Sequence, residues 1–289
     1  MTGNLLLVCS YPKSGNTWVR FVFEALRRGP HRAISINDMG TGLYAFWRRA
    51  LFDELAPVNA SELLMDEIDD LLPQVYRRAA AESGDPLIVK VHDMAFRTRS
   101  GEWLYPPDSV GCAVYLVRHP FDVAVSYAHH LNISVEAAVD MMGRSEIMAP
   151  SGPRLILPLH ERVGSWSGNV GSWLDQSALP LALARYEDLH ADPVAGFARL
   201  AAAAGLAAAT TDVARAVEAA RFDRLQQEEK SSGFSGRPRS SSQFFRVGRP
   251  RSWEGALKAG LQERLVREHG DAMARLGYAA DGSVLPLPC

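Results

Sequence analysis

Residues 4–21 contain the feature that most constrains this chain: an apolar run, a polar loop and then apolar residues at helical spacing. The run at 5–8 predicts a short buried strand, and the pattern after the loop predicts a helix. The loop itself, residues 11–17, reads Y-P-K-S-G-N-T. A strand, a tight loop and a helix N-terminus aim several backbone N–H groups at one point, and such a point binds anions, phosphates in particular. The loop also supplies a mobile charge and two hydroxyls, those of Lys13, Ser14 and Thr17.

The position of the lysine separates this loop from that of common nucleotide triphosphatases. The Walker A pattern, G-x-x-x-x-G-K-[ST], places its lysine after the second glycine, whereas Lys13 precedes Gly15. The order P-K-S-G-N-T-W instead resembles the 5′-phosphosulfate loop of sulfotransferases that use 3′-phosphoadenosine 5′-phosphosulfate (PAPS). A plain strand–helix turn with an incidental lysine is the alternative interpretation of the loop alone.

Length and composition set the bounds of the interpretation. A chain of 289 residues fits one large α/β domain or two small ones, and 47% apolar residues are ample for a core. The net charge of −2 gives no general attraction to nucleic acid. Three scattered cysteines, Cys9, Cys112 and Cys289, are too few for a disulfide framework or a zinc site. No apolar stretch reaches the roughly 18 residues of a membrane span, and the N-terminal run is too short for a signal peptide. We therefore expect a soluble, cytoplasmic protein without nucleic-acid or membrane partners.

A second strand is predicted at Pro86–His92, and it ends in a lysine and a histidine. Lys90 and His92 are two residues apart, so they point to the same side of a strand. They fall at its C-terminal end, where open α/β sheets gather their ligands. The run K-V-H resembles the K-T-H element of sulfotransferases, which implies that His92 is the general base and that Lys90 assists at the sulfuryl oxygens. Asp93 and Met94 stand where that element usually has Leu-Pro.

A third strand is predicted at Gly111–Val117, and it leads into the run R-H-P-F-D-V-A-V-S. Pro120 is suited to the first position of a helix, and the planar fork of Arg118 is suited to a phosphate dianion. The run resembles the 3′-phosphate-binding motif of the same family, R-[NDH]-P-x-D-x-x-x-S. The resemblance implies that Arg118 and Ser126 hold the 3′-phosphate, and that Ser126 restrains Lys13 until the acceptor binds.

A fourth strand is predicted at Leu181–Tyr186, followed by E-D-L-x-x-D-P. Asp192 is a natural helix N-cap with Pro193 at the first helical position. The combined signature R-Y-E-D-L-x-x-D-P again resembles sulfotransferases, in which the tyrosine contacts adenine. By this resemblance Tyr186 and Trp18 flank the adenine.

Residues 230–253 differ in composition from the rest of the chain, with six basic residues, no acidic residue and many Ser and Gly. Such a segment is usually a solvated linker, but local positive charge also suits a mobile lid over a polyanion. The piece F-F-R-V-G…W resembles the sulfotransferase segment R-K-G…G-x-W, which clamps the 3′-phosphate and adenosine. Val247 replaces its lysine, and Arg249 or Arg251 could compensate.

Other segments are predicted to be structural. Residues 61–82 read as an amphipathic helix, interrupted or kinked near Pro73. Trp166 and Trp173 are seven residues apart, hence on one helical face, and core packing accounts for them. A last helix is expected at about Leu261–Leu276 as structural closure.

The acceptor-binding region is the least readable part of the sequence. Residues 131–160 are expected to contribute to it, and an aromatic cluster after the first helix could form a pocket wall: Tyr44, Phe46 and Trp47. His129 and His130 are expected on a helix surface with no ligand role.

Together these segments predict a single sulfotransferase domain over residues 1–289, with a central parallel sheet flanked by helices and a P-loop-like nucleotide-binding core. The resemblance implies PAPS as cosubstrate, 3′-phosphoadenosine 5′-phosphate (PAP) as product, no metal and a small-molecule hydroxyl acceptor. The sequence leaves open whether the protein is a monomer or a homodimer. The resemblance assigns catalysis to His92, Lys13, Lys90 and Ser126. It assigns the nucleotide to Lys13, Ser14, Gly15, Asn16, Thr17, Trp18, Arg118, Ser126, Tyr186, Phe245, Arg246, Val247 and Gly248. A P-loop kinase-like enzyme and a non-catalytic PAP-binding protein are the alternatives.

Overall fold

A parallel sheet of four strands forms the centre of the molecule, in the order β2-β1-β3-β6. The strands are β1 (Leu5–Ser10), β2 (Leu87–Val91), β3 (Val110–Val117) and β6 (Leu181–Arg185). The computed structural model describes residues 3–29, 32, 34–37, 49–145, 148–149, 159–176, 178–206, 208–237 and 241–287. All four strands were predicted from the sequence, and each observed end lies within two residues of the predicted end.

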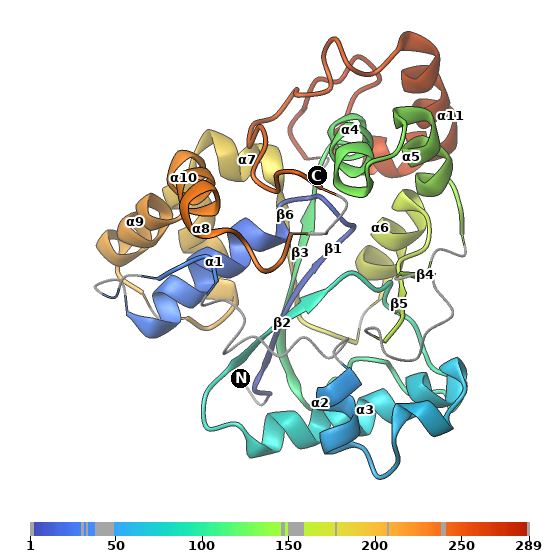
Figure 1. Cartoon of the computed structure of the whole chain (residues 1–289), viewed down its shortest axis with the longest axis vertical. Coiled ribbons are helices and arrows are strands. Elements are labelled where there is room, and N and C mark those ends of the chain that lie inside the picture. The colour runs from blue at the N-terminus through green and yellow to red at the C-terminus, as the bar shows by residue number, and fades with distance from the viewer. Residues whose placement is uncertain are drawn as a thin grey trace.

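Helices cover both faces of this sheet, as Figure 1 shows. One face carries α1 (Asn16–Arg28), α8 (Pro193–Ala203) and α9 (Thr210–Ala219), whose apolar side chains share a core with Leu6, Val8 and Ile88. The other face carries α3 (Met65–Glu82), α4 (Pro120–Leu131), α6 (Trp166–Asp175) and α11 (Ala259–Arg275), packed on Leu5, Leu7 and Val89. Burial on both faces explains why the strands are almost continuously apolar rather than alternating.

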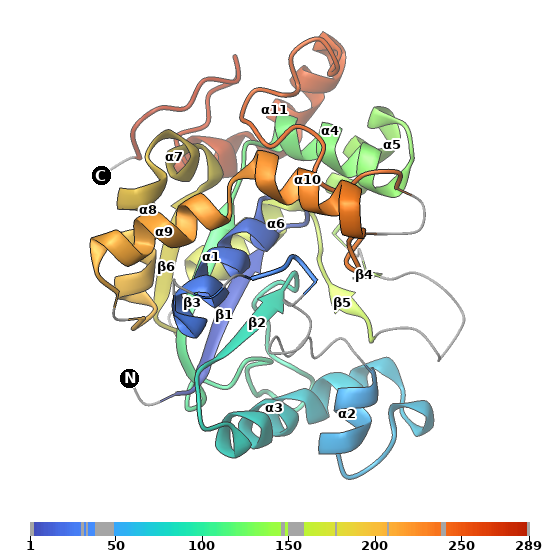
Figure 2. The ribbon, with the colours of Figure 1, turned by 60° about the vertical axis from the view of Figure 1, so that its left-hand side comes forward.

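The remaining elements are short and lie around the sheet (Figure 2). They are α2 (Arg49–Leu55), the 3₁₀ turn η2 (Ala60–Glu62), α5 (Val135–Met142), α7 (Tyr186–Ala191), α10 (Phe222–Ser232) and a two-stranded pair, β4 (Met148–Ala149) with β5 (Glu161–Arg162). Among the described helices, none combines the length and the apolar character needed to cross a bilayer.

Local sequence signals placed the helix ends correctly. Pro120 and Pro193 occupy the first turns of α4 and α8, and Asp192 accepts a hydrogen bond from the backbone N–H of Ala195 at 3.1 Å. Trp166 and Trp173 are fully buried in the core, as expected. Of the two forms predicted near Pro73, an interruption or a kink, the interruption is wrong, because α3 continues through this buried proline. A proline removes only one backbone donor, and burial of the helix face compensates for that loss.

Candidate active site

A cavity of about 870 Å³ lies where the four parallel strands end. The residue or loop that follows each strand contributes to its lining: Lys13 after β1, His92 after β2, Arg118 after β3 and Tyr186 after β6. This is the edge at which open parallel sheets bind ligands. The predicted site residues in its lining are Lys13, Gly15, Asn16, Thr17, Trp18, Lys90, His92, Arg118, Ser126, Tyr186, Phe245, Arg246, Val247 and Gly248.

The loop after β1 has the backbone geometry of an anion site. Lys13 and Gly15 have φ angles of 71° and 101°, so the chain turns sharply before α1 begins at Asn16. No side chain caps the first turn of α1. The N–H of Trp18 donates to the carbonyl oxygen of Gly15 at 2.9 Å, so the N–H groups before it are the ones suited to a ligand. The Asn16 amide instead holds the loop to β1 through the carbonyl oxygen of Val8 at 2.7 Å.

Only glycine fits at position 15. A Cβ there would lie 2.8 Å from Cδ2 of Tyr186, and the left-handed φ adds backbone strain for any other residue. The loop therefore packs directly against the tyrosine that follows β6.

The ammonium group of Lys13 lies inside the cavity without a carboxylate partner among the described residues. Its Nζ is 3.3 Å from Nδ1 of His130 and 4.4 Å from the ring centroid of Phe244. Burial, followed by the nearby charges of Arg118, Arg246 and Lys90, lowers the pKa of Lys13 to about 7. The expected partner Ser126 lines the same cavity, but the recorded contacts of Lys13 are with His130 and Phe244.

Lys90 and His92 project from the face of β2 that carries α1. Ile88, two residues before Lys90, belongs to the core on that face, which confirms the predicted alternation. The Nδ1 atom of His92 is 2.8 Å from the backbone oxygen of Ser10. A carbonyl oxygen only accepts, so Nδ1 carries the proton and Nε2 carries the free lone pair. Burial, and then the charge of Lys90, lower the pKa of His92 well below its ordinary value, so the ring is neutral at pH 7.

Arg118 follows β3 and is held by contacts on several sides. Its Nη2 donates to the backbone oxygen of Arg249 at 2.9 Å and lies 3.5 Å from Oδ2 of Asp122. The guanidinium lies 4.4 Å from the ring centroid of Tyr186. Its Nε is buried and has no hydrogen-bond partner. One edge of the fork is therefore available to a ligand in the cavity.

Trp18 and Tyr186 both line the cavity, and their rings contact one another. The ring centroids are 5.8 Å apart in an edge-to-face arrangement, which is a direct contact. No third ring fits between them, so an adenine could lie against this pair but not be sandwiched by it. This refines the expectation that the two residues flank the base.

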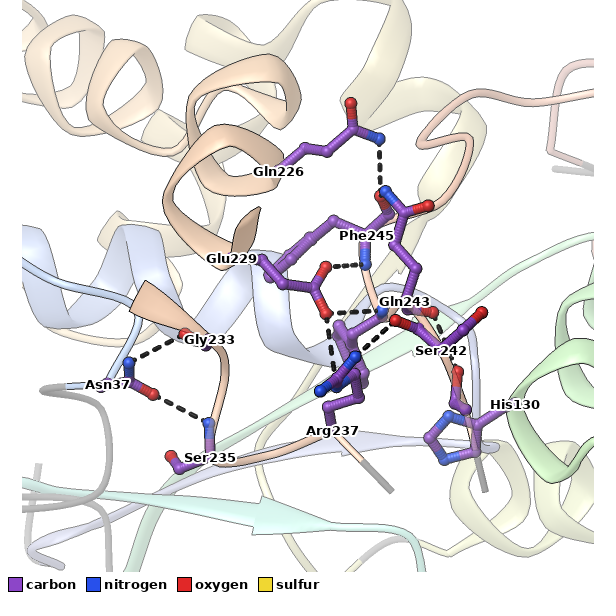
Figure 3. A network of polar contacts seen from close by, with 12 residues as sticks. Asn37, His130, Gln226, Glu229, Gly233, Ser235, Arg237, Ser242, Gln243 and Phe245 are labelled. Carbon is purple, nitrogen blue, oxygen red and sulfur yellow. Dashed lines mark hydrogen bonds and ion pairs between the residues drawn. The ribbon is translucent and has the colours of Figure 1, made fainter. Parts of the chain in front are cut away.

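Described residues of the 230–253 segment line the cavity, and the segment is anchored at two places, at residues 244–245 and at its C-terminal end. Glu229, on α10, accepts hydrogen bonds from the backbone N–H groups of Phe244 and Phe245 at 2.7 and 2.9 Å (Figure 3). At the far end, Asp122 accepts from the backbone N–H of Arg251, at 2.8 Å, and from that of Trp253, at 3.1 Å. Its first residues, up to Ser232, belong to α10 rather than to a loop.

Among the described residues of this segment, the charged side chains that line the cavity are those of Arg237 and Arg246. Arg251, one of the two residues expected to replace the missing lysine, instead forms an ion pair with Glu254 at 2.6 Å. Glycine is required at position 248, because a Cβ there would lie 2.0 Å from the ring of Phe222.

The sequence interpretation did not assign many of the other lining residues to the site, among them Arg20, His130, Glu161 and Phe244. The expectation that His130 lies on the helix surface is corrected, because this residue is half-buried and lines the cavity. Helical spacing could have revealed two of them, because Arg20 follows Asn16 by four residues and His130 follows Ser126 by four. Ser14 is the one predicted site residue outside the lining, since its side chain is fully buried beneath the loop and its Oγ has no hydrogen-bond partner.

Asp93, which stands where the sulfotransferase element after the second strand usually has leucine, has a structural role. It is buried, accepts from the hydroxyl of Tyr105 at 2.9 Å and from the backbone N–H of Arg162, and its carbonyl accepts from Nε1 of Trp173. It therefore ties the end of β2 to β5 and α6.

Some expectations fall outside the described residues. These include the aromatic cluster Tyr44, Phe46 and Trp47, the acceptor-region residues 150–158, and Cys289. Within the described part of the chain, no three His, Cys, Asp or Glu side chains are grouped to hold a metal ion; the metal-free reaction stays a prediction.

The fold and the cavity define an α/β protein with a central parallel sheet, whose loop after β1 has the backbone geometry of an anion site. A sequence model of the sulfotransferase domain matches residues 4–277, and the chain belongs to this family of enzymes. No curated protein sequence matches the chain.

Solved structures with the same fold include two complexes that contain PAP. A retinol dehydratase in complex with androsterone and the inactive cofactor PAP has a TM-score of 0.64 at 19% identity, and the match covers 94% of this chain and 81% of that chain. A mouse sulfotransferase complexed with PAP has a TM-score of 0.59 at 16% identity, covering 94% of this chain and 84% of that chain. At these identities the likeness establishes the fold alone.

Proposed function

We propose that this sulfotransferase takes the sulfuryl group from PAPS and transfers it to a hydroxyl group of a small-molecule acceptor, with His92 as general base. The orientation of His92 carries the proposal. Its Nδ1–H donates to Ser10, and its depressed pKa keeps Nε2 unprotonated at neutral pH. A hydroxyl is a poor nucleophile until a base accepts its proton, and a neutral imidazole at the cavity wall is suited to that task.

The donor assignment is supported by the distribution of positive charge. The uncapped start of α1 and Lys13 suit a 5′-phosphate, while Arg118 and Arg246 suit a 3′-phosphate. Arg118 has a buried, unpartnered Nε, and Lys13 has no carboxylate against it among the described residues. A doubly phosphorylated adenosine would pair with both groups at once, and related folds hold PAP.

PAPS, when bound, supplies a sulfuryl group that is activated by its link to the 5′-phosphate. In the transfer, the acceptor oxygen forms its bond to sulfur as the bond from sulfur to the phosphate oxygen breaks, and the hydroxyl proton goes to Nε2 of His92. Lys13 and the N–H groups of the loop then stabilise the negative charge that develops on the phosphate oxygen, an effect worth about 3 kcal/mol for a well-placed donor. Lys90, on the same side of β2 as His92, assists at the sulfuryl oxygens.

We assign the 230–253 segment the role of a lid that covers the bound nucleotide. Phe245, Arg246, Val247 and Gly248 line the cavity opposite the loop that follows β1. We assign them to the adenosine and its 3′-phosphate, with Tyr186 and Trp18 against one side of the base.

Binding of the donor is tested by thermal denaturation with PAP, AMP, ATP or NAD. A nucleotide at about 100 times its dissociation constant adds about 2.7 kcal/mol to stability, which raises the melting temperature by several degrees in a domain of this size. PAP should stabilise most, and AMP, which lacks the 3′-phosphate, much less. If PAP stabilised no more than AMP or ATP, the donor assignment would be wrong.

The role of His92 is tested by transfer from labelled PAPS to a panel of phenols and alcohols. His92→Ala should lower turnover by about 10²- to 10⁴-fold, the usual contribution of a general base, and leave PAP affinity within a few-fold. His129→Ala is the matched control, because His129 is an exposed histidine of α4 outside the cavity. Near-normal turnover of His92→Ala would exclude the histidine as base.

A further inference from the structure

The amine of Lys13 lies between two aromatic rings that come from distant parts of the chain. Its Nζ is 3.3 Å from Nδ1 of His130, in the last turn of α4, and 4.4 Å from the ring centroid of Phe244. The two rings also contact each other edge to face, with centroids 5.9 Å apart. The loop after β1, the end of α4 and the 230–253 segment therefore meet at this amine.

The contact with His130 is a hydrogen bond in which the lysine donates. In its charged form Lys13 has only N–H donors, so Nδ1 of His130 accepts and the ring proton lies on Nε2. Burial, followed by the charges of Lys13 and Lys90, lowers the pKa of His130 to about 3, so the ring is neutral at pH 7. A neutral acceptor fixes the direction of the amine without cancelling its positive charge, as a carboxylate would.

His130 stands one helical turn after Ser126, the residue that the resemblance implies as the restraint on Lys13. Residues four apart share a face of a helix, and both side chains line the cavity. Among the described residues, the polar contact of Lys13 is with His130. The second ring at the amine is fixed as well, because the backbone N–H of Phe244 donates to Glu229 at 2.7 Å.

We propose that His130 is a positioning residue that holds the amine of Lys13 in place for sulfuryl transfer. A lysine side chain has four flexible carbons, and its charge is effective only where it meets the oxygen on which negative charge develops. The inference deepens the proposed function and rests on it for that oxygen. His130 takes up no proton and touches no reacting atom in this role.

Two replacements of nearly the same shape test the proposal. His130→Asn keeps an acceptor, because the side-chain oxygen of asparagine occupies the place of Nδ1, whereas His130→Leu removes it. In transfer from saturating labelled PAPS to the panel of phenols and alcohols, His130→Leu should lower kcat about tenfold, the loss expected for one hydrogen bond to a charged group. His130→Asn should retain kcat within about threefold of wild type, and both variants should keep PAP affinity within about threefold. His129→Leu is the control, because His129 is the exposed neighbour on α4 outside the cavity.

A double-mutant cycle separates positioning from packing. In a Lys13→Met background there is no amine to hold, so His130→Leu should change the remaining kcat by less than about twofold. A ring that served only the packing of α4 would cause the same loss in both backgrounds.

A second measurement does not depend on the transfer reaction. Competitive acetylation of the nucleotide-free protein with acetic anhydride, followed by mass spectrometry, gives the pH titration of Lys13. An acceptor stabilises the ammonium form, so the pKa of Lys13 should fall below the wild-type value in His130→Leu and stay close to it in His130→Asn. Both variants leave unchanged the charges that act most on this amine: Arg118, Arg246, Lys90 and Glu229.

Three results would overturn the proposal: equal kcat for His130→Leu and His130→Asn, an equal loss in both backgrounds of the cycle, or an unchanged titration of Lys13 in His130→Leu. Failure of the proposed function has a different signature. If wild type transferred no sulfuryl group to any acceptor, the function would fail on that measurement alone, and the titration of Lys13 would still decide whether His130 holds it.

Discussion

Binding of PAP should take up a proton, and Lys13 should be the group that receives it. In the free protein, burial and three neighbouring cations lower the pKa of Lys13 to about 7. A phosphate beside Nζ favours the charged form, so the pKa of Lys13 in the complex returns toward its ordinary value near 10.4. Between these two values the complex binds more protons than the free protein, and PAP affinity must therefore fall as pH rises above 7.

The size of the effect follows from the pKa of about 7 in the free protein. At about pH 8 the free protein carries the lysine proton in roughly one molecule in eleven, so binding takes up about 0.9 proton per PAP. The same linkage makes binding about eightfold weaker at pH 8.5 than at pH 7.5. Phosphate groups, with a second pKa near 6, are fully ionised over this range and contribute little.

Calorimetry at about pH 8, in buffers of different ionisation enthalpy, measures the proton uptake directly. Lys13→Arg is the most informative variant, because a guanidinium keeps its charge at every accessible pH. This variant should bind PAP without proton uptake, and its affinity for PAP should not change with pH. Lys13→Met should bind weakly and also without uptake. Two results would refute this assignment: no proton uptake by wild type, or the same uptake by Lys13→Met as by wild type. Either result would show that Lys13 is not the group that takes up the proton.

Three further results are expected. Arg118→Ala should weaken the binding of PAP by roughly ten- to a hundredfold, as expected for the loss of a charged hydrogen bond. The binding of adenosine 5′-phosphosulfate, which has no 3′-phosphate, should weaken much less. If titrations showed equal weakening for both ligands, the 3′-phosphate would have to bind elsewhere. Trypsin should cut the 230–253 segment more slowly when PAP is present, and Glu229→Ala should lose most of this protection, because the N–H groups of Phe244 and Phe245 lose their acceptor; equal cleavage with and without PAP would argue against a lid. The acid limb of turnover should lie well below pH 6.5, since the base form of His92 persists to low pH when its pKa is depressed; a limb at or above that pH would contradict a buried, neutral base.

The sequence predicts the fold and the nucleotide side of the cavity because both depend on local patterns. The apolar run before Tyr11 and the proline at position 120 specify a strand end and a helix start, and the elements follow within a few residues. Since parallel strands bring their C-terminal ends to one edge, motifs that are far apart in sequence converge there without further information. Lys13, His92, Arg118 and Tyr186 line one cavity for this reason.

The remaining cavity residues were harder to predict, because helical spacing marks Arg20 and His130 as sharing a helix face with Asn16 and Ser126 but does not show that this face lines a cavity. Arg20 and His130 lie inside helices whose apolar faces dominate the periodicity, and a helical charge is usually solvated. Glu161 comes from a two-residue strand that no propensity specifies. Their common position depends on how α1, α4 and β5 pack, which is a tertiary property.

The charges of the cavity fall into two groups, and this explains how one site can attract a polyanion while the general base stays neutral. Strong positive potential lowers the pKa of every nearby imidazole, and neutralisation of that potential by a bound nucleotide would raise the pKa again. The groups that hold down the pKa of His92, however, are burial and the charges of Lys90 and Arg20, which lie toward β2. A second set, Arg118 and Arg246, lowers the pKa of Lys13 and is not among the main causes of the shift of His92, whereas Lys90 acts on both Lys13 and His92. Neutralising the second set therefore leaves the first in place, and His92 can remain unprotonated, ready to accept a proton, when the donor site is filled.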